Sequence, residues 1–223
     1  MCRRQIPSVL LAGLVLVCLA LPAVAADKGV PPGFKPLFNG KDLTGWKLYC
    51  GTSDVWTTED GSIVTSGESK GWLFTDKEYG DFELRLEFKV SPNGDSGVAI
   101  RAPRAGHVPT FNDPSIEGLE IQLLDDGGTA LQNPGEFPTG SIWGLVRPTE
   151  KASRPAGQWN TLRIVARDRQ LTVFLNDKKV VDAGLDDFQA KATKFPGLTR
   201  EKGFLGLQSA AGQAEFRNLY IKE

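Results

Sequence analysis

Hydrophobic and polar residues alternate with a period of two along several short segments of the chain, which is the pattern of β-strands with one buried face. The clearest segment is 81–90, DFELRLEFKV, where every second residue from Phe82 to Val90 is apolar and every residue between them is charged. A strand face that carries only charge indicates an antiparallel sheet with one side in water. We therefore predict a strand here, followed by a turn at Pro92-Asn93-Gly94.

Other segments with strand character lie between turns rich in Gly, Asn, Asp and Pro. They are residues 96–102, 118–122, 141–146, 159–167, 171–176, 179–182, 203–209 and 215–222. A single helical turn is expected within residues 186–194. Many short strands without a helical repeat predict an all-β sandwich, although the pattern alone does not separate a sandwich from a closed barrel. Two long irregular stretches, 103–117 and 126–139, are expected to be functional loops.

The N-terminal segment differs in character from the rest of the chain. Arg3 and Arg4 precede an apolar run from Val9 to Leu21, and small residues follow at positions 23–25. This pattern predicts a secretory signal peptide over residues 1–25, and the apolar run is short for a membrane span. We expect residues 26–36 to form a linker, residues 37–223 to form one β-sandwich domain, and the cleaved chain to be exported to the periplasm or the extracellular space.

Composition narrows the possible functions. Without residues 1–25, 24 basic residues face 27 acidic ones, so we expect no nucleic-acid partner and no membrane partner after cleavage. Cys50 is then the only cysteine, which excludes an internal disulfide and a thiolate metal cluster. His107 is the only histidine, which excludes a site with two histidine ligands from one chain. The sequence does not define an oligomeric state.

The segment 118–126, GLEIQLLDD, holds the main candidates for chemistry. Leu119, Ile121 and Leu123 share one strand face, and Glu120 and Gln122 share the other. A solvated sheet face and a sugar-binding groove are the two interpretations of this polar face. The spacing resembles that of paired catalytic carboxylates, but an amide cannot ionise, so Gln122 disfavours an ordinary double-displacement glycosidase.

Four further residues are candidates. Arg101 is opposite in parity to Val98 and Ile100, so it is expected on the same face as Glu120, where it could stabilise negative charge. His107 in the first long loop could act as an acid or base, or be exposed without a role. Asp125 could bind substrate or, with Asp126, a divalent metal such as Ca²⁺. Trp143 follows a Gly- and Pro-rich loop and could stack on a sugar ring.

Several segments together resemble the 3-keto-disaccharide hydrolase family. They are Gly33–Trp46, Val55-Trp56 with residues 60–63, Gly80–Lys89, Asp95–Arg101, Gly118–Asp126, Thr139–Gly144, Trp159-Asn160, Gly203–Gln208 and Phe216–Ile221. The resemblance implies a concanavalin-A-like jelly-roll sandwich of two curved antiparallel sheets. The chain departs from the family pattern in having Asp95 where Asn is expected before Ser-Gly, and Trp143 where Tyr is common.

The resemblance also implies an enzyme that cleaves the glycosidic bond of 3-keto-disaccharides or 3-keto-glucosides. A ketone at C3 acidifies the C2 proton, so removal of that proton, loss of the C1 oxygen and addition of water give net hydrolysis. In this interpretation Glu120 is the base or acid, Arg101 or a divalent metal stabilises the enolate, and Gln122, Trp143, Asp125 and His107 bind the sugar. The alternative is a lectin-like carbohydrate-binding module without catalysis, because the same fold hosts both.

Overall fold

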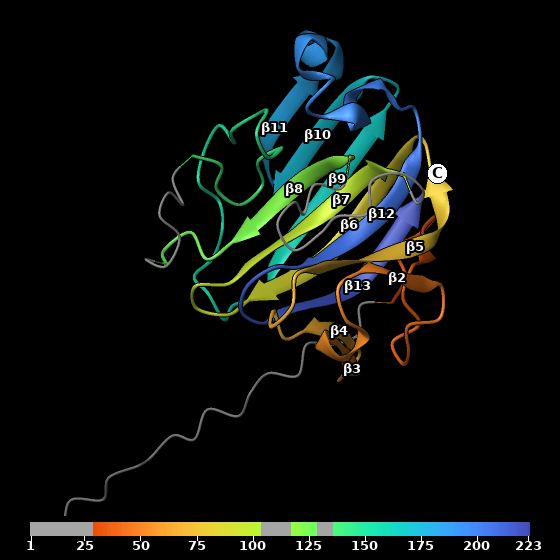
Figure 1. Ribbon diagram of the computed structural model, residues 1–223, viewed down its shortest axis with the longest axis vertical. Helices are drawn as coiled ribbons and strands as arrows, with labels where there is room; N and C mark the ends of the chain where they lie inside the picture. The colour runs from red at the N-terminus through yellow and green to blue at the C-terminus, as the bar shows by residue number, and fades with distance from the viewer. Residues whose placement is uncertain (1–28, 104–116, 129–135) are drawn as a thin grey trace, which may run out of the picture.

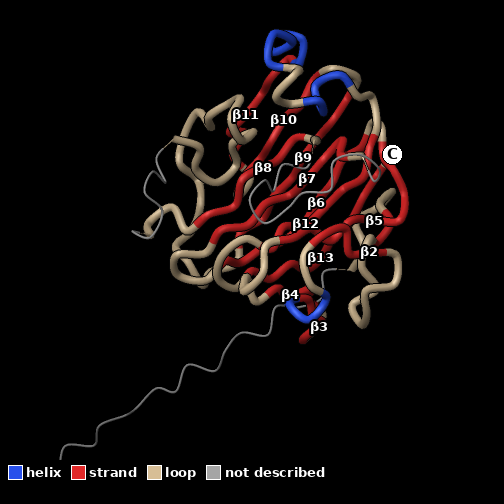
Figure 2. Tube along the Cα trace, in the orientation of Figure 1, coloured by secondary structure: helices blue, strands red, loops and turns tan. Residues whose placement is uncertain are grey.

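The computed structural model describes residues 29–103, 117–128 and 136–223 and shows two antiparallel β-sheets packed face to face (Figure 1). The order in the first sheet is β11-β10-β9-β6-β13-β4-β3, with β1 also paired to β13; the order in the second is β2-β5-β12-β7-β8. Short 3-10 helices lie at the two ends of the strands (Figure 2). Two separate sheets make the fold a sandwich rather than a closed barrel.

The strands of the first sheet are β1 (Lys35–Pro36), β3 (Trp56–Glu59), β4 (Ser62–Thr65), β6 (Phe82–Val90), β9 (Asn160–Arg167), β10 (Gln170–Leu175), β11 (Lys178–Gly184) and β13 (Ala214–Lys222). Those of the second are β2 (Trp46–Cys50), β5 (Gly71–Tyr79), β7 (Asp95–Ala102), β8 (Leu119–Leu124) and β12 (Gly203–Ser209). The 3-10 helices are η1 (Ser53–Val55), η2 (Leu185–Lys191) and η3 (Pro196–Thr199).

Strand β6 shows why the sheets pack. Its residues alternate between buried and partly buried along the whole strand, as the sequence predicts, and Phe82 and Phe88 are almost completely buried. Burying one large apolar side chain contributes roughly 1.5–3 kcal/mol. The apolar faces of both sheets meet in one core, so removal of this surface from water drives the layers together.

The outer face of the first sheet carries ion pairs, among them one within β6 and two between β6 and β13. Glu83 lies 2.7 Å from Arg85, and Glu87 lies 2.8 Å from Arg217 on β13. Lys89 lies 2.8 Å from Glu215. This face is in contact with water, so the charged residues of β6 form part of the protein surface.

The second sheet is apolar on parts of both faces. On β5, Leu73 points into the core, whereas Trp72 and Phe74 stack with ring centroids 6.0 Å apart in a second cluster. Ala99 and Ala102 of β7 belong to the same second cluster. The outer face of the second sheet therefore has apolar surface close to the polar groups of β7 and β8.

Some local predictions differ from the structure. Residues 141–146 do not form a strand but a tight turn, in which Ile142 makes isolated bridges to Ile121 and Val146. Gly144 adopts a φ of +73° there, which bends the chain. At the N-terminus, Lys35 and Pro36 pair with Ile221 and Tyr220 although they fall in the expected linker. Proline is tolerated because β1, among the described strands, pairs with β13 alone and so lies at an edge.

The expected signal peptide, residues 1–25, lies outside the described residues. Within the part of the chain that is described, no helix has the length and apolar character needed to cross a membrane.

Candidate functional site

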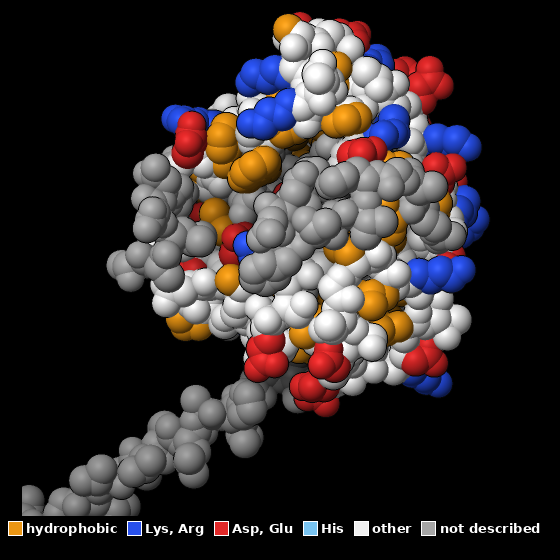
Figure 3. All heavy atoms as spheres, viewed as in Figure 1, with side chains coloured by type: hydrophobic (Ala, Val, Ile, Leu, Met, Phe, Trp, Pro, Cys, Tyr) orange, Lys and Arg blue, Asp and Glu red, His pale blue; other side chains and the backbone are white. Residues whose placement is uncertain are grey.

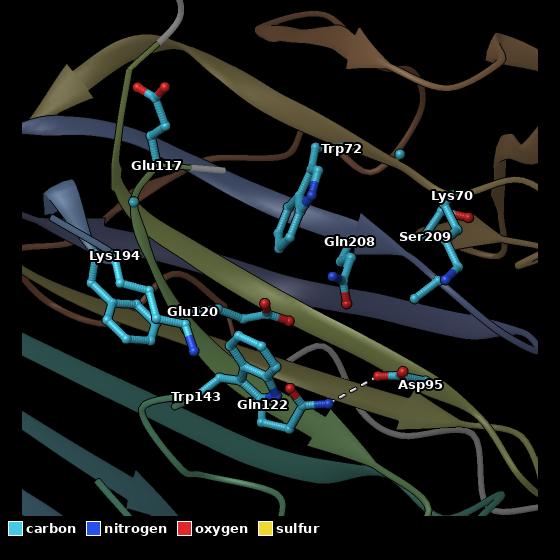
Figure 4. A pocket seen from close by; sticks show the side chains of 14 residues that line it. Lys70, Trp72, Asp95, Glu117, Glu120, Gln122, Trp143, Lys194, Gln208 and Ser209 are labelled. Carbon is cyan, nitrogen blue, oxygen red and sulfur yellow. Dashed lines mark hydrogen bonds between the residues drawn. The ribbon is translucent and has the colours of Figure 1, made fainter. Parts of the chain in front are cut away.

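A pocket of about 500 Å³ opens on the outer face of the second sheet. Figure 3 shows this side of the molecule, where hydrophobic and acidic side chains gather around the hollow. Strands β5, β7, β8 and β12 supply the floor, and the turn at Trp143 and the segment between η2 and η3 supply the rim (Figure 4). The lining residues are Lys70, Gly71, Trp72, Asp95, Glu117, Gly118, Glu120, Gln122, Trp143, Lys194, Phe195, Gln208, Ser209 and Ala210.

Glu120 and Gln122 both line this pocket, whereas Leu119, Ile121 and Leu123 of the same strand are buried in the core. The alternation of β8 therefore places its polar face in a hollow of the sheet. Gln122 is 5% exposed and Glu120 is partly buried, so this is not an open solvated face.

Gly97 on β7 makes room for the Glu120 side chain. A Cβ atom at position 97 would lie 2.2 Å from Glu120 Oε1, and its three nearest neighbours would all belong to the Glu120 side chain. Real Cβ atoms do not approach other atoms so closely. The Glu120 carboxyl group therefore lies directly over Gly97.

This position changes the acid strength of Glu120. Burial, and then the nearby charge of Asp95, raise the pKa of Glu120 from 4.5 to about 8. Burial penalises the charged form of a carboxyl group, and a second carboxylate adds repulsion. Glu120 therefore holds its proton at neutral pH and can release it near that pH, a property typical of a catalytic acid or base.

Asp95 stands at the start of β7 and joins Glu120 and Gln122 in the pocket. The Gln122 amide Nε2 donates a hydrogen bond of 2.9 Å to Asp95 Oδ1 (Figure 4). Burial raises the pKa of Asp95, and this hydrogen bond and the positive charge of Lys70 oppose that rise. The bond also fixes the orientation of the Gln122 amide, whose carbonyl oxygen then points away from Asp95.

Trp143 is held beside Glu120 by the backbone. Its N–H donates to the Glu120 carbonyl at 2.9 Å, so the turn covers the free edge of β8. The Trp143 side chain is 47% exposed at the rim and meets the Phe195 ring edge-on, with centroids 6.5 Å apart. A Cβ at Gly144 would come within 2.5 Å of the Phe195 ring, so glycine permits this packing.

Arg101 does not line the pocket. Its guanidinium donates to the backbone carbonyls of Arg200 and Asp168, and its side chain is 1% exposed. Arg101 has a φ of +52°, and the pairing of β7 with β12 is irregular at this point, so strict alternation ends after Ile100. The expectation from parity fails for this physical reason, and Ala102 takes the outer face instead.

Replacing Arg101 by Met is expected to destabilise the fold rather than to alter pocket chemistry selectively. The backbone carbonyls of Arg200 and Asp168 would lose the buried charged donor that joins them, which costs about 2–4 kcal/mol. Thermal unfolding should show a clear fall in melting temperature for this variant. The control is Arg147→Met, because that side chain is 62% exposed and its contacts, a 3.7 Å ion pair with Glu136 and the ring of Phe137, lie at the surface. Equal melting temperatures for the two variants would contradict the structural role.

Asp125 also lies outside the pocket lining. Its carboxylate accepts backbone N–H bonds from Asn93 at 2.9 Å and Gly127 at 3.1 Å, so it organises the loop after β8. His107 lies outside the described residues. Across the described ranges 29–103, 117–128 and 136–223, no group of three or more His, Cys, Asp and Glu side chains is arranged to hold a metal ion.

The structure adds lining residues that the sequence reasoning did not select. In the sequence, Asp95 is distinguished only by its place before Ser-Gly, where the family pattern has Asn. Gln208 follows the alternation of β12, in which Leu205 and Leu207 face the core, so the pattern of residues 203–209 could have indicated it. Lys194 and Phe195 reach the rim from a segment distant in sequence, and no local pattern predicts that.

Comparisons with known proteins identify the family and the fold. The model of a family described as the 3-keto-alpha-glucoside-1,2-lyase-like domain matches residues 33–222. A protein of Bacteroides thetaiotaomicron named 3-keto-disaccharide hydrolase is 26% identical over 228 residues, which cover 85% of this chain and 78% of that protein.

Solved structures show the same architecture. A crystal structure from Parabacteroides distasonis, described as that of a candidate glycosyl hydrolase, has a TM-score of 0.72 at 27% identity and covers 85% of this chain and 93% of its own. The carbohydrate-binding module CBM66 from Bacillus subtilis has a TM-score of 0.51 at 14% identity over 82% of this chain and 98% of its own, a likeness of fold alone. The predicted all-β concanavalin-A-like jelly roll is confirmed.

Proposed function

The chain belongs to the family of 3-keto-alpha-glucoside-1,2-lyase-like domains, and from this premise we propose that it cleaves the glycosidic bond of 3-keto-disaccharides or 3-keto-glucosides. One observation carries the proposal. The pocket contains a carboxyl group, Glu120, whose pKa of about 8 suits proton exchange with a substrate near neutral pH. A sugar-binding module has no need of such a group.

The chemistry follows from the ketone. A carbonyl at C3 makes the neighbouring C2 proton acidic, and its removal gives an enolate. The C1 oxygen lies β to the carbonyl and leaves as the enolate collapses to an unsaturated ketone. Water then adds across the new double bond, so that elimination followed by hydration amounts to hydrolysis. This route needs proton transfers but no carboxylate nucleophile, which agrees with an amide at Gln122.

The pocket residues take the following roles in this proposal. Glu120 transfers a proton, and the Gln122 amide, held by Asp95, binds a sugar hydroxyl. Trp143 offers its exposed ring to the apolar face of a pyranose. Because Arg101 lies elsewhere, the positive charge opposite a developing enolate comes from the two lysines that line the pocket, Lys70 and Lys194. The expected export of the enzyme rests on residues 1–25 alone.

A lectin-like module is the second candidate, favoured by the partly exposed Trp143 at the rim. The test is to incubate the purified protein with 3-keto-trehalose, 3-keto-sucrose and the corresponding unoxidised disaccharides, and to follow product formation by chromatography. We expect turnover of the keto sugars only. Binding without turnover would support the module, and turnover of the plain disaccharides alone would indicate an ordinary glycosidase.

A further inference from the structure

Three polar side chains meet around Gly97 on the pocket floor. Glu120 lies over this glycine, Gln122 is its partner in the β7–β8 ladder, and Asp95 is two residues before it on β7. Residues two apart on a strand share a face and are separated by roughly 6.5–7 Å. Asp95 and Glu120 thus bring two carboxyl groups to the same part of the floor, and the Gln122 amide binds the first of them.

This arrangement matches a need of the proposed reaction. The C2 proton and the C1 oxygen sit on adjacent carbons, and cleavage requires one group to remove the proton and another to protonate the leaving oxygen. An acid or base acts within roughly 2.6–3.2 Å of its target. Carboxyl pairs separated by roughly 5–9.5 Å serve the two sides of glycosidic bonds in other enzymes.

We propose that Asp95 and Glu120 divide the two proton transfers of bond cleavage, with Asp95 removing the C2 proton and Glu120 protonating the departing C1 oxygen. This inference rests on the proposed function and adds a catalytic residue to it. The structural support is that both carboxyl groups line one pocket and that the Gln122 amide donates a hydrogen bond to Asp95.

Atoms and charges balance over the cycle. Asp95 starts as a carboxylate and takes the C2 proton; the C–H electron pair forms the enolate. The enolate expels the C1 oxygen, which takes the proton of Glu120. In the hydration step the Glu120 carboxylate removes a proton from water as its oxygen adds to C1, and Asp95 returns its proton to C2. Both carboxyl groups are then in their starting states, and no other reactant than water is used.

The protonation of the free enzyme agrees with these roles. Glu120, with a pKa of about 8, is the member that holds a proton at neutral pH. Burial raises the pKa of Asp95, whereas the hydrogen bond that it accepts from the Gln122 amide and the charge of Lys70 favour its ionised form. The other charged groups that line the pocket are Glu117, Lys70 and Lys194.

The test compares Asp95→Asn and Glu120→Gln on two substrates. One is methyl 3-keto-glucoside, whose leaving oxygen needs a proton; the other is 4-nitrophenyl 3-keto-glucoside, whose leaving group does not. Exchange of the C2 proton for deuterium in D₂O, followed by NMR, measures base action separately from bond cleavage. Spontaneous elimination is subtracted with a protein-free sample, and Asp186→Asn is the control, because Asp186 is 69% exposed and pairs with Arg169 instead.

We expect Asp95→Asn to lose C2 exchange and both cleavages by at least about 100-fold. Glu120→Gln should lose cleavage of the methyl glycoside by a similar factor, keep C2 exchange, and cleave the nitrophenyl substrate within about ten-fold of the wild type. Retained exchange in Asp95→Asn, or equal losses on both substrates in Glu120→Gln, would overturn the division of roles. A wild-type protein inactive on every keto-glucoside would instead reject the proposed function itself.

Discussion

Replacing Glu120 by Gln is expected to lower turnover of a 3-keto-disaccharide by at least about 100-fold while the protein stays folded. Gln keeps the shape of a protonated Glu and its place over Gly97, but it can neither give nor take the proton. Steady-state assays with a sugar leaving group measure the loss. Full activity in this variant would remove Glu120 from the mechanism.

The same variant has a stability signature that does not depend on any substrate. Glu120 has a pKa of about 8 in the folded chain, against 4.5 for the unperturbed group. Between these values the unfolded chain releases the proton and the folded chain retains it, so wild-type stability falls as pH rises through this window. Gln lacks this penalty. We therefore expect Glu120→Gln and the wild type to have nearly the same melting temperature below pH 4.5. Above that pH the variant should melt at a higher temperature than the wild type, and the difference should be largest above pH 8.

Calorimetric scans of both proteins at several pH values would check this difference. Titrating groups far from Glu120 contribute equally to the two proteins, so their effects cancel in the comparison. Asp95 interacts with Glu120, so its titration belongs to the measured difference. A difference independent of pH would show that Glu120 is not desolvated as the structure has it, whatever its role in catalysis.

Replacing Gly97 by Ala is expected to lower turnover by about 100-fold with little change in stability. The new methyl group would occupy the place of the Glu120 carboxyl group and push it aside. A displacement of about 1 Å at a reacting group costs about 100-fold in rate. Gly97 does not adopt a positive φ, and the nearest atoms are those of a flexible side chain, so the backbone accepts alanine.

Turnover and melting temperature should be measured together for Gly97→Ala. Gly80→Ala is the matched control, because Gly80 has no positive φ and the nearest atom to its added Cβ would be 3.6 Å away. Normal turnover in Gly97→Ala would contradict the position of Glu120 over this strand. A large fall in stability would show that the backbone, and not the side chain, resists the change.

The sequence predicted the structure best in strands whose residues alternate regularly between apolar and polar. The alternation in residues 82–90 predicts β6 with its buried and charged faces, and the GLEIQ pattern places Glu120 and Gln122 on a face opposite the core. Alternation does not hold at Arg101, where a positive φ makes β7 irregular. The strand predicted over residues 141–146 is a turn that pairs with the edge of β8.

By itself, the sequence determined that this protein is an all-β protein and that residues 118–122 carry a polar pair on one strand face. Both follow from local rules, because side chains alternate along a strand and the burial of apolar side chains is favourable. The two separate sheets, which make the fold a sandwich and not a closed barrel, are a property of the tertiary structure. Only the tertiary structure decided that Asp95, Gly97 and Glu120 meet, and that Trp143 and Lys194 border the same pocket. It also decided that the Arg101 guanidinium binds backbone carbonyls and not the pocket. Those contacts join segments far apart in the chain, and their geometry depends on strand register and on bulges, which no local pattern specifies.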